Sequence, residues 1–245
     1  MMGKDAEVLA RVSFAGNALA PFFLEDPRTG SAGMQFATFA MLDAAEAGSE
    51  WPFVAAADAE RSLSMMIDGL AASCVTAGGD ARRAAGGAVE RARDAPRVPI
   101  SATFCADDSL TWEYRRLFVG PAPKPAPPWG SVYTDHERVV FGEGTLALRT
   151  WMRMHGVARV TDDKEPEDHI GLMLALMAWL AENKPALLDE YLRLHLLTWS
   201  SHYLDALAKA SEHPFYEGLA RLTKATLEGI QEKRGVSVER PRFYR

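Results

Sequence analysis

The spacing of apolar residues at every third and fourth position, the period of an amphipathic α-helix, constrains this chain most. It runs through three segments near the start of the chain: residues 5–20, 35–47 and 58–75. Leu63, Met66 and Leu70 are one example. The alternation typical of β-strands is nearly absent, and only Ser131 to Phe141 suits a short extended piece. The sequence therefore predicts an all-α protein.

The most apolar stretch, Ile170 to Ala181, has 12 residues and is followed by Glu182. A membrane-spanning helix needs about 20 such residues, so we expect a buried helix of a globular core. Near the start of the chain, Asp5, Glu7 and Arg11 interrupt the apolar region that a secretion signal needs. Because the chain also has only 2 cysteines, we expect a cytoplasmic protein without stable membrane insertion.

The charge balance bears on the partners that this chain can bind. It has 27 Lys and Arg against 33 Asp and Glu, a formal net charge of −6, and its 48% hydrophobic residues are typical of a soluble globular protein. A net acidic protein binds nucleic acid and anionic lipid poorly, so we expect no nucleic-acid partner. A basic peptide remains a suitable partner.

The first helical half covers about residues 1–120. It contains a stretch rich in Gly, Ala and Arg at 76–107, where we expect a surface loop with one short helix at Ala84 to Asp94. Helical spacing resumes from Asp108 to Phe118, and the Gly120–Pro121 pair ends that helix because proline cannot continue it.

The second helical half covers about residues 134–232, and both halves form one domain over residues 1–245. Its helices are expected at four places: 145–156, 166–181, 185–210 and 214–232. Three of these begin with a proline in the first turn, where the missing N–H costs nothing. A basic tail, residues 233–245, is expected to fray or to lie on the surface.

A Pro-rich connection, residues 121–133, joins the two halves. Its first eight positions, PAPKPAPP, are stiff and extended because proline fixes its backbone. We expect a rigid loop held by Trp129 and Tyr133 rather than a ligand for an SH3-type domain, since such ligands usually sit in disordered tails.

The segment EPEDH, from Glu165 to His169, allows two interpretations. In the first it starts a helix, with Glu165 at the cap, Pro166 at the first position, and Glu167 and Asp168 in the first turn. In the second, its carboxylates and imidazole form a polar recognition site for an arginine-bearing ligand.

Other chemistries find little support in the sequence. Glu165, Asp168 and His169 lack the second histidine four residues on that marks a zinc-binding helix, and no phosphate-binding loop or nucleophile motif occurs. His195 and His202 are seven residues apart, about 10 Å along one helix, which is too far for one ion. We therefore expect two ordinary, partly buried histidines, no metal site, no cofactor and no enzyme activity.

Four motifs follow one another over roughly Trp112 to Ile230. They are YRRLFVGP at Tyr114–Pro121, APPWGSVY at Ala126–Tyr133, EPEDHI at Glu165–Ile170, and a helix with His195, Leu196, Trp199 and Tyr203. In this order they resemble the TorD/DmsD family of cytoplasmic chaperones for twin-arginine-exported molybdoenzymes, whose signature E-P-x-D-H the third motif matches. Thr198 and Tyr203 depart from the family's helix motif, which has proline and phenylalanine there.

The resemblance implies a TorD-like helical bundle that binds the twin-arginine signal peptide, the apoprotein, or both, of a molybdopterin-dependent oxidoreductase. Such a chaperone assists cofactor insertion and prevents premature export. By resemblance, binding of the signal peptide or client falls to eight residues: Leu117, Phe118, Gly120, Trp129, Tyr133, Glu165, Asp168 and His169.

Two alternatives stay open beside this interpretation. One is a NarJ-like assembly chaperone for a molybdoenzyme subunit that is not exported. The other is a slow nucleotide hydrolase that uses Asp168 and His169 as acid and base. The resemblance also leaves open weak binding of guanine nucleotide, and either a monomer or a domain-swapped dimer.

Overall fold

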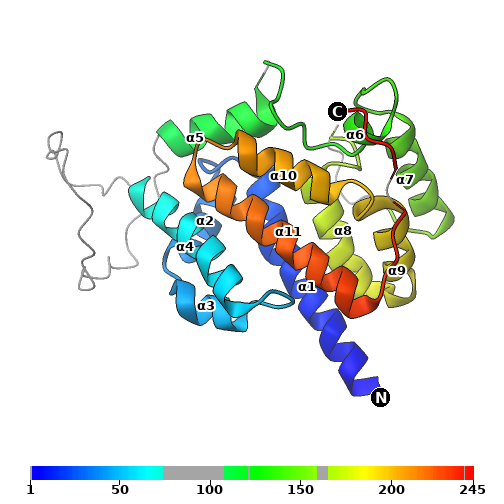
Figure 1. The fold of residues 1–245 in the computed structure, drawn as a ribbon, viewed down its shortest axis with the longest axis horizontal. Coiled ribbons are helices and arrows are strands. Elements are labelled where there is room, and N and C mark those ends of the chain that lie inside the picture. Colours follow the sequence, from blue (N-terminus) through cyan, green and yellow to red (C-terminus); the bar gives the residue numbers. More distant parts are fainter. Residues whose placement is uncertain (1, 74–107, 121, 159–164, 240) are drawn as a thin grey trace, which may run out of the picture.

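Helices make up most of the computed structural model, which describes residues 2–73, 108–120, 122–158, 165–239 and 241–245 (Figure 1). No strand occurs among these residues, which confirms the all-α prediction. The elements are, in chain order, α1 (Met2–Leu24), α2 (Gly30–Ala40), α3 (Ala44–Glu50), α4 (Ala56–Ala72), α5 (Asp108–Tyr114), η1 (Arg115–Val119), α6 (Ser131–Thr134), α7 (Glu143–Met154), α8 (Ile170–Asn183), η2 (Pro185–Leu187), α9 (Leu188–Tyr191), η3 (Leu192–Leu196), α10 (Ser200–Ala210) and α11 (Pro214–Arg234). The loop expected at 76–107, with its short helix, lies outside the described residues.

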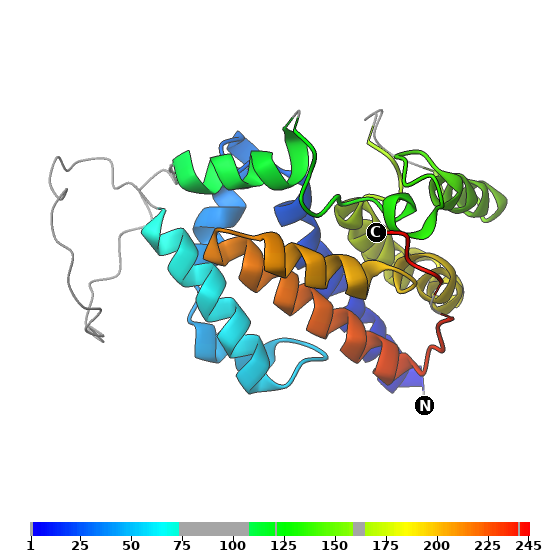
Figure 2. The ribbon, with the colours of Figure 1, turned by 45° about the horizontal axis from the view of Figure 1, so that its top comes forward.

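The two halves of the chain are interleaved in the core. Helix α1 packs along α8, and α11 packs on both α4 and α10. In Figures 1 and 2, α1 (blue) runs behind the pair formed by α10 and α11 (orange). Elements from the first half therefore bury their apolar faces against elements from the second.

Two glycines allow α1 and α8 to approach closely. A Cβ on Gly16 would lie 2.6 Å from the main-chain oxygen of Leu174, and a Cβ on Gly171 would lie 2.6 Å from Cγ of Leu24. Residues larger than glycine would push the two helices apart. The apolar run predicted to form a buried helix is α8, and Leu174 and Met177 on it are fully buried.

Two of the expected helices are interrupted. The segment 35–47 divides between α2 and α3, because the side chain of Asp43 accepts hydrogen bonds from the amides of Ala45 and Glu46 (3.0 and 2.9 Å) and starts a new helix. The segment 185–210 starts at Pro185 as expected. It then passes through η2, α9 and the π-helix η3 before α10 begins at Ser200.

The extended piece expected at Ser131 to Phe141 is wrong. The chain there forms the single-turn helix α6 and then turns, with Arg138 and Phe141 at positive φ. No helix in the described part of the chain is both long enough and apolar enough to cross a membrane.

The basic tail follows α11 beyond Gly235, whose left-handed conformation (φ 66°) ends the helix. It lies on the surface, as expected, and Figure 1 shows its red trace ending beside α6. The amide of Tyr244 donates to the main-chain oxygen of Tyr133 (2.9 Å). Of the two outcomes expected for the tail, its last described residues show the second, since they lie on the surface and are hydrogen-bonded there.

Candidate functional site

The EPEDH segment is a turn that precedes α8, not the first turn of that helix. The amide of His169 donates to the main-chain oxygen of Pro166 (3.1 Å), and α8 begins at Ile170. His169 is the N-cap, since its Nδ1 accepts a hydrogen bond from the amide of Gly171 (3.2 Å). The expected helix start at Glu165 and Pro166 is therefore wrong by four residues.

A short backbone pairing joins this turn to the Pro-rich connection, and we call it the latch (residues 128–131 with 168–170). Trp129 and His169 form an isolated antiparallel bridge. The amide of Ile170 donates to the oxygen of Pro128 (2.9 Å), and the amide of Gly130 donates to the oxygen of Asp168 (3.2 Å). The latch therefore fixes where the Pro-rich connection crosses the start of α8.

The carboxylate of Asp168 reinforces the latch from inside. Asp168 is only 3% exposed, and its Oδ2 accepts a hydrogen bond from the amide of Ser131 (2.7 Å), the first residue of α6. Burial raises the pKa of Asp168, and hydrogen bonds from Ser131 and Thr145 oppose that shift in part. The side chain thus ties α6 to the turn before α8.

His169 is buried to the same extent, with 3% of its surface exposed. Burial and, second, the charge of Lys124 lower the pKa of His169 to about 3, so its imidazole is neutral near pH 7. Both Asp168 and His169 therefore lie beneath the surface, where a peptide resting on this fold would not touch them. Their assignment to client binding stays a prediction.

Helix α7 braces the same turn from its outer side. The guanidinium of Arg149 makes two hydrogen bonds to the carboxylate of Glu167 (3.0 and 2.7 Å). A two-point contact of this kind fixes orientation as well as distance. The turn is thus held by α6 and α7 as well as by the Pro-rich connection.

Trp129 and Glu165 are the members of the expected site that reach the surface together. Both are partly exposed, and Nε1 of Trp129 donates to Oε1 of Glu165 (2.5 Å). Nζ of Lys124 lies 5.4 Å from the centre of the Trp129 ring and donates to the main-chain oxygen of Gly120 (3.2 Å). Through Lys124, the structure brings Gly120, Trp129 and Glu165 to one place.

Three carboxylates lie near enough to the buried Tyr114 to influence its hydroxyl, and we call them the acidic group (Glu25, Asp26 and Glu165). Burial, and then the charges of Asp26, Glu165 and Glu25 in that order, raise the pKa of Tyr114. Asp26 also pairs with the exposed Arg115 (3.3 Å). Arginines of a ligand would complement this concentration of negative charge.

Glu25 and Asp26 are not among the residues expected from the sequence. They directly follow α1, at the negative end of its helix dipole, where carboxylates are unfavourable. Two acidic residues at such a position are the signal in the sequence that could have pointed to them, although Asp26 also accepts a hydrogen bond from the amide of Arg28 (2.9 Å).

The remaining expected site residues belong to the core. Leu117, Phe118 and Tyr133 are 0%, 6% and 1% exposed. The Tyr133 ring stacks on Trp199 (6.0 Å between ring centres, 15° between planes). These three side chains support the surface from below, so the structure does not gather all eight expected residues into one exposed site.

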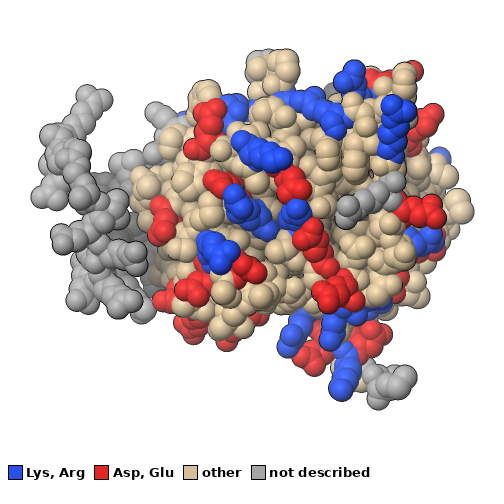
Figure 3. All heavy atoms as spheres, viewed as in Figure 1, with Lys and Arg blue, Asp and Glu red and all other residues tan. Residues whose placement is uncertain are grey.

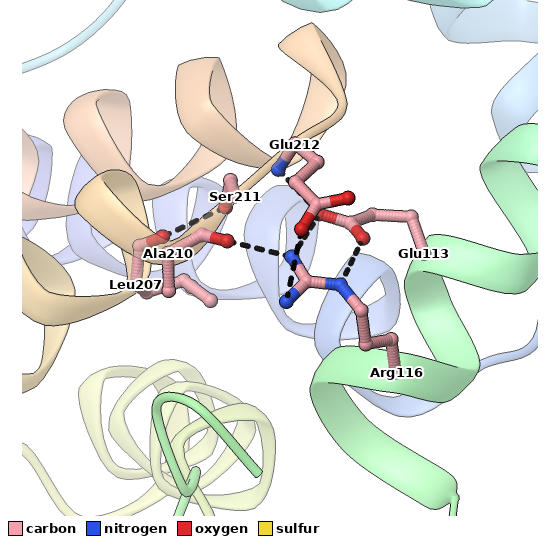
Figure 4. A network of polar contacts seen from close by, with 6 residues as sticks. All are labelled: Glu113, Arg116, Leu207, Ala210, Ser211 and Glu212. Carbon is pink, nitrogen blue, oxygen red and sulfur yellow. Dashed lines mark hydrogen bonds and ion pairs between the residues drawn. The ribbon is translucent and has the colours of Figure 1, made fainter.

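The helix that leads into the Pro-rich connection is anchored to the end of α10 (Figure 4). Arg116 binds both oxygens of Glu113 (2.7 and 2.9 Å) and donates to the main-chain oxygen of Ala210 (2.6 Å). The amide of Glu212 donates to the same Glu113 carboxylate (2.7 Å), which is 2% exposed. This network holds η1, and hence the start of the Pro-rich connection, in place.

The two expected histidines are partly buried, as predicted. The rings of Trp151 and Tyr191 lie 5.5 and 6.2 Å from that of His195, and burial lowers the pKa of His195 to about 4. His202 stacks on Phe243. Within the described ranges, no group of three His, Cys, Asp or Glu residues could hold a metal ion.

The similarity to known proteins covers about half of the chain. The family model described as "Nitrate reductase delta subunit" matches residues 104–209. A Haemophilus influenzae protein named "Probable Tat proofreading chaperone DmsD" is 50% identical over 137 residues, which are 56% of this chain and 68% of that protein. The Salmonella typhimurium Tat proofreading chaperone DmsD is 46% identical over 133 residues, 53% of this chain and 65% of the relative.

A more distant similarity is to the chaperone protein TorD of Vibrio cholerae, 26% identical over 148 residues, 56% of this chain and 62% of that protein. The matched stretch is thus about two thirds of each relative's length. The chain belongs to the TorD/DmsD family of Tat proofreading chaperones.

Proposed function

We propose that this chain is a cytoplasmic chaperone that binds the twin-arginine leader peptide, and the apoprotein, of a molybdopterin-dependent oxidoreductase. It assists cofactor insertion and prevents premature export. The observation that carries this proposal is the 50% identity over 137 residues to a protein named as a Tat proofreading chaperone. The acidic group beside the half-exposed Trp129 fits the same chemistry.

The arginines of the leader bind at the acidic group. Asp26 and Glu165 both raise the pKa of the buried Tyr114, so a leader guanidinium at the surface near that residue would interact with more than one carboxylate. The apolar stretch of the leader contacts Trp129 and the exposed Trp112 and Val119 of α5 and η1.

Asp168 and His169 act as positioning residues in this proposal. Because the latch fixes Trp129, whose indole binds Glu165, damage to the latch displaces both surface residues. This explains how two side chains that are 97% buried can matter to a surface site. It gives no support to a nucleotide hydrolase, in which the pair would have to touch the substrate.

The NarJ-like alternative has one observation in its favour, the match of residues 104–209 to the nitrate reductase delta subunit family. In that case the partner is a subunit that is not exported. The two candidate functions differ in the peptide that the chain binds, which is either a twin-arginine leader or a segment of a subunit that is not exported.

Isothermal titration with a synthetic twin-arginine leader, including its apolar stretch, tests the proposal. We expect binding that weakens when both leader arginines become alanine and when the salt concentration rises. Glu165→Gln and Asp26→Asn should each raise the Kd at least about threefold, since each removes one charge from the acidic group.

Glu137→Gln is the matched control, because Glu137 is exposed in the turn after α6 and lies outside the acidic group. Glu190 is unsuitable as an acidic control, since its carboxylate accepts a hydrogen bond from Trp151 (2.9 Å). A leader that fails to bind, while the N-terminal segment of a non-exported molybdoenzyme subunit binds, would replace this proposal with the NarJ-like one.

A further inference from the structure

The last described residues of the tail are seated on the Pro-rich connection. The guanidinium of Arg245 donates to the main-chain oxygens of Lys124 (2.9 Å) and Pro125 (3.3 Å). The amide of Tyr244 donates to the oxygen of Tyr133, at the other end of that connection. An arginine and a backbone amide of one extended segment thus occupy acceptors along the connection.

Aromatic contacts hold the same segment against α10. The ring of Phe243 stacks on His202 at 4.3 Å with 8° between the planes, and Nε2 of His202 lies 2.7 Å from the main-chain oxygen of Arg245. Tyr244 makes an edge contact with His136 (5.5 Å). We call the surface that receives the tail the tail groove (Lys124, Pro125, Tyr133 and His202).

The tail groove has the chemistry to receive an arginine from any extended peptide. Prolines have no N–H to donate, so a segment rich in them cannot pair its carbonyls in a regular strand. The oxygens of Lys124 and Pro125 are left for outside donors, and a guanidinium carries five N–H groups in a planar fork.

The described tail is held at both ends, because the side chain of Gln231 donates to the main-chain oxygen of Val236 (3.1 Å) and Arg245 binds the Pro-rich connection. A cavity of about 160 Å³ lies between α10, α11 and the tail, and Val238 and Phe243 form its tail side. Figure 3 shows that basic and acidic side chains are interspersed over the neighbouring face of α10 and α11. There Lys224 pairs with Asp205 (2.7 Å), so part of the negative charge on that face is already paired.

We propose that the tail groove is a binding surface for an extended peptide that carries arginine next to aromatic or apolar residues. The chain's own tail is its resident occupant, and a client peptide displaces it. The inference rests on the proposed function, because a twin-arginine leader presents the residue types that the tail presents in Arg242, Phe243 and Arg245.

The tail groove is continuous with the proposed leader site. The main-chain oxygen of Lys124 holds Arg245, while Nζ of the same residue lies over Trp129, the partner of Glu165. A leader bound at Trp129 that extends along the Pro-rich connection meets the tail. Tail and leader therefore compete, and the docked tail weakens leader binding.

The test compares the wild-type chain with the full-length double variant Phe243→Ala/Arg245→Ala, using a fluorescently labelled twin-arginine leader. If the tail is docked for nine-tenths of the time, its release lowers the Kd for the leader about tenfold. Ser237→Ala, an exposed tail residue before the groove, is the matched control and should leave the Kd unchanged.

A second arm adds a free peptide with the sequence of residues 236–245 to the double variant. We expect this peptide to bind the variant and to displace the labelled leader, whereas the same peptide with alanine at 243 and 245 should do neither. Leader binding with the same or a higher Kd in the double variant would overturn the competition alone. A leader that binds neither form would overturn the proposed function and the competition together.

Discussion

At the scale of single residues, the contact between Asp168 and the amide of Ser131 can be tested by two substitutions. Asp168→Ala leaves a buried N–H without an acceptor and should lower the free energy of unfolding by about 2–3 kcal/mol. Asp168→Asn keeps an acceptor and removes a charge whose burial is unfavourable, so it should cost much less. Urea unfolding measures both.

Titration of the same variants with the leader shows whether Asp168 positions the latch or contacts the client through its charge. Asp168→Asn should retain leader binding if the residue acts through the latch, because the hydrogen bond to Ser131 persists. If Asp168→Asn folds like the wild type yet loses binding, the Asp168 charge itself contacts the client, and the positioning role is wrong.

The buried imidazole of His169 gives the fold a dependence on pH. Its pKa is about 3 in the folded protein and about 6.5 in an unfolded chain, so only the unfolded chain takes up a proton between these values. The stability that the neutral His169 contributes is therefore present above about pH 6.5 and is lost as the pH drops toward 3. His195, with a pKa of about 4, acts in the same direction. Asp168 acts oppositely, since its raised pKa favours the folded state at lower pH.

His169→Asn isolates this contribution, because asparagine can cap α8 and does not titrate. Between pH 6.5 and 5, the wild type should lose about 1.5 kcal/mol more stability than this variant. Urea unfolding at several pH values measures the difference. Parallel pH profiles for the two proteins would show that the imidazole stays accessible to protons in the folded state.

At the scale of elements, the close contact of α1 and α8 depends on Gly16. Gly16→Ala places a Cβ 2.6 Å from a main-chain oxygen of α8 and should destabilise the protein by about 1–3 kcal/mol. Gly3→Ala in the same helix meets nothing within 4 Å and should be neutral or slightly stabilising. Both variants add one methyl group to α1, so their thermal melts compare the same chemical change at two positions. Equal melting temperatures would mean that the helices can separate freely.

The elements also show what could be predicted from local sequence. The apolar run from Ile170 onward predicted α8, and Pro214 predicted the start of α11, because both signals lie within the helix itself. The start of α8 was misplaced because the turn before it pairs with Pro128 and Gly130, about 40 positions away in the chain. Helix rules contain no information on such a distant partner.

The candidate site was predictable only in part, for the same reason. The resemblance identified Trp129 and Glu165, which meet at the surface, but also Leu117 and Tyr133, which are buried. A motif records which residues matter and does not separate those that touch a ligand from those that support it. The position of Asp26, which follows α1, near Tyr114 depends on tertiary packing alone.

At the scale of the whole molecule, the contacts across the interleaved halves predict one cooperative unfolding unit. Helix α1 buries its apolar face on α8, and α4 buries its face on α11. The indole of Trp51, from the first half, donates to the hydroxyl of Thr226 on α11 (2.9 Å) within the core. Separating the halves would expose both apolar faces and leave this pair unsatisfied.

Hydrogen exchange in mild denaturant tests this cooperativity. Amides in α1, α4, α8 and α11 should exchange through the same global opening, with a common free energy and a common dependence on denaturant. The tail and the last turn of α11 should open at lower free energy, because the tail borders a cavity and most of its described residues are partly or fully exposed. If α1 and α4 exchanged well before α8 and α11, then α8 and α11 would keep their protection without their packing partners. The two halves would then be separate folding units, and the prediction of one cooperative unit would be wrong.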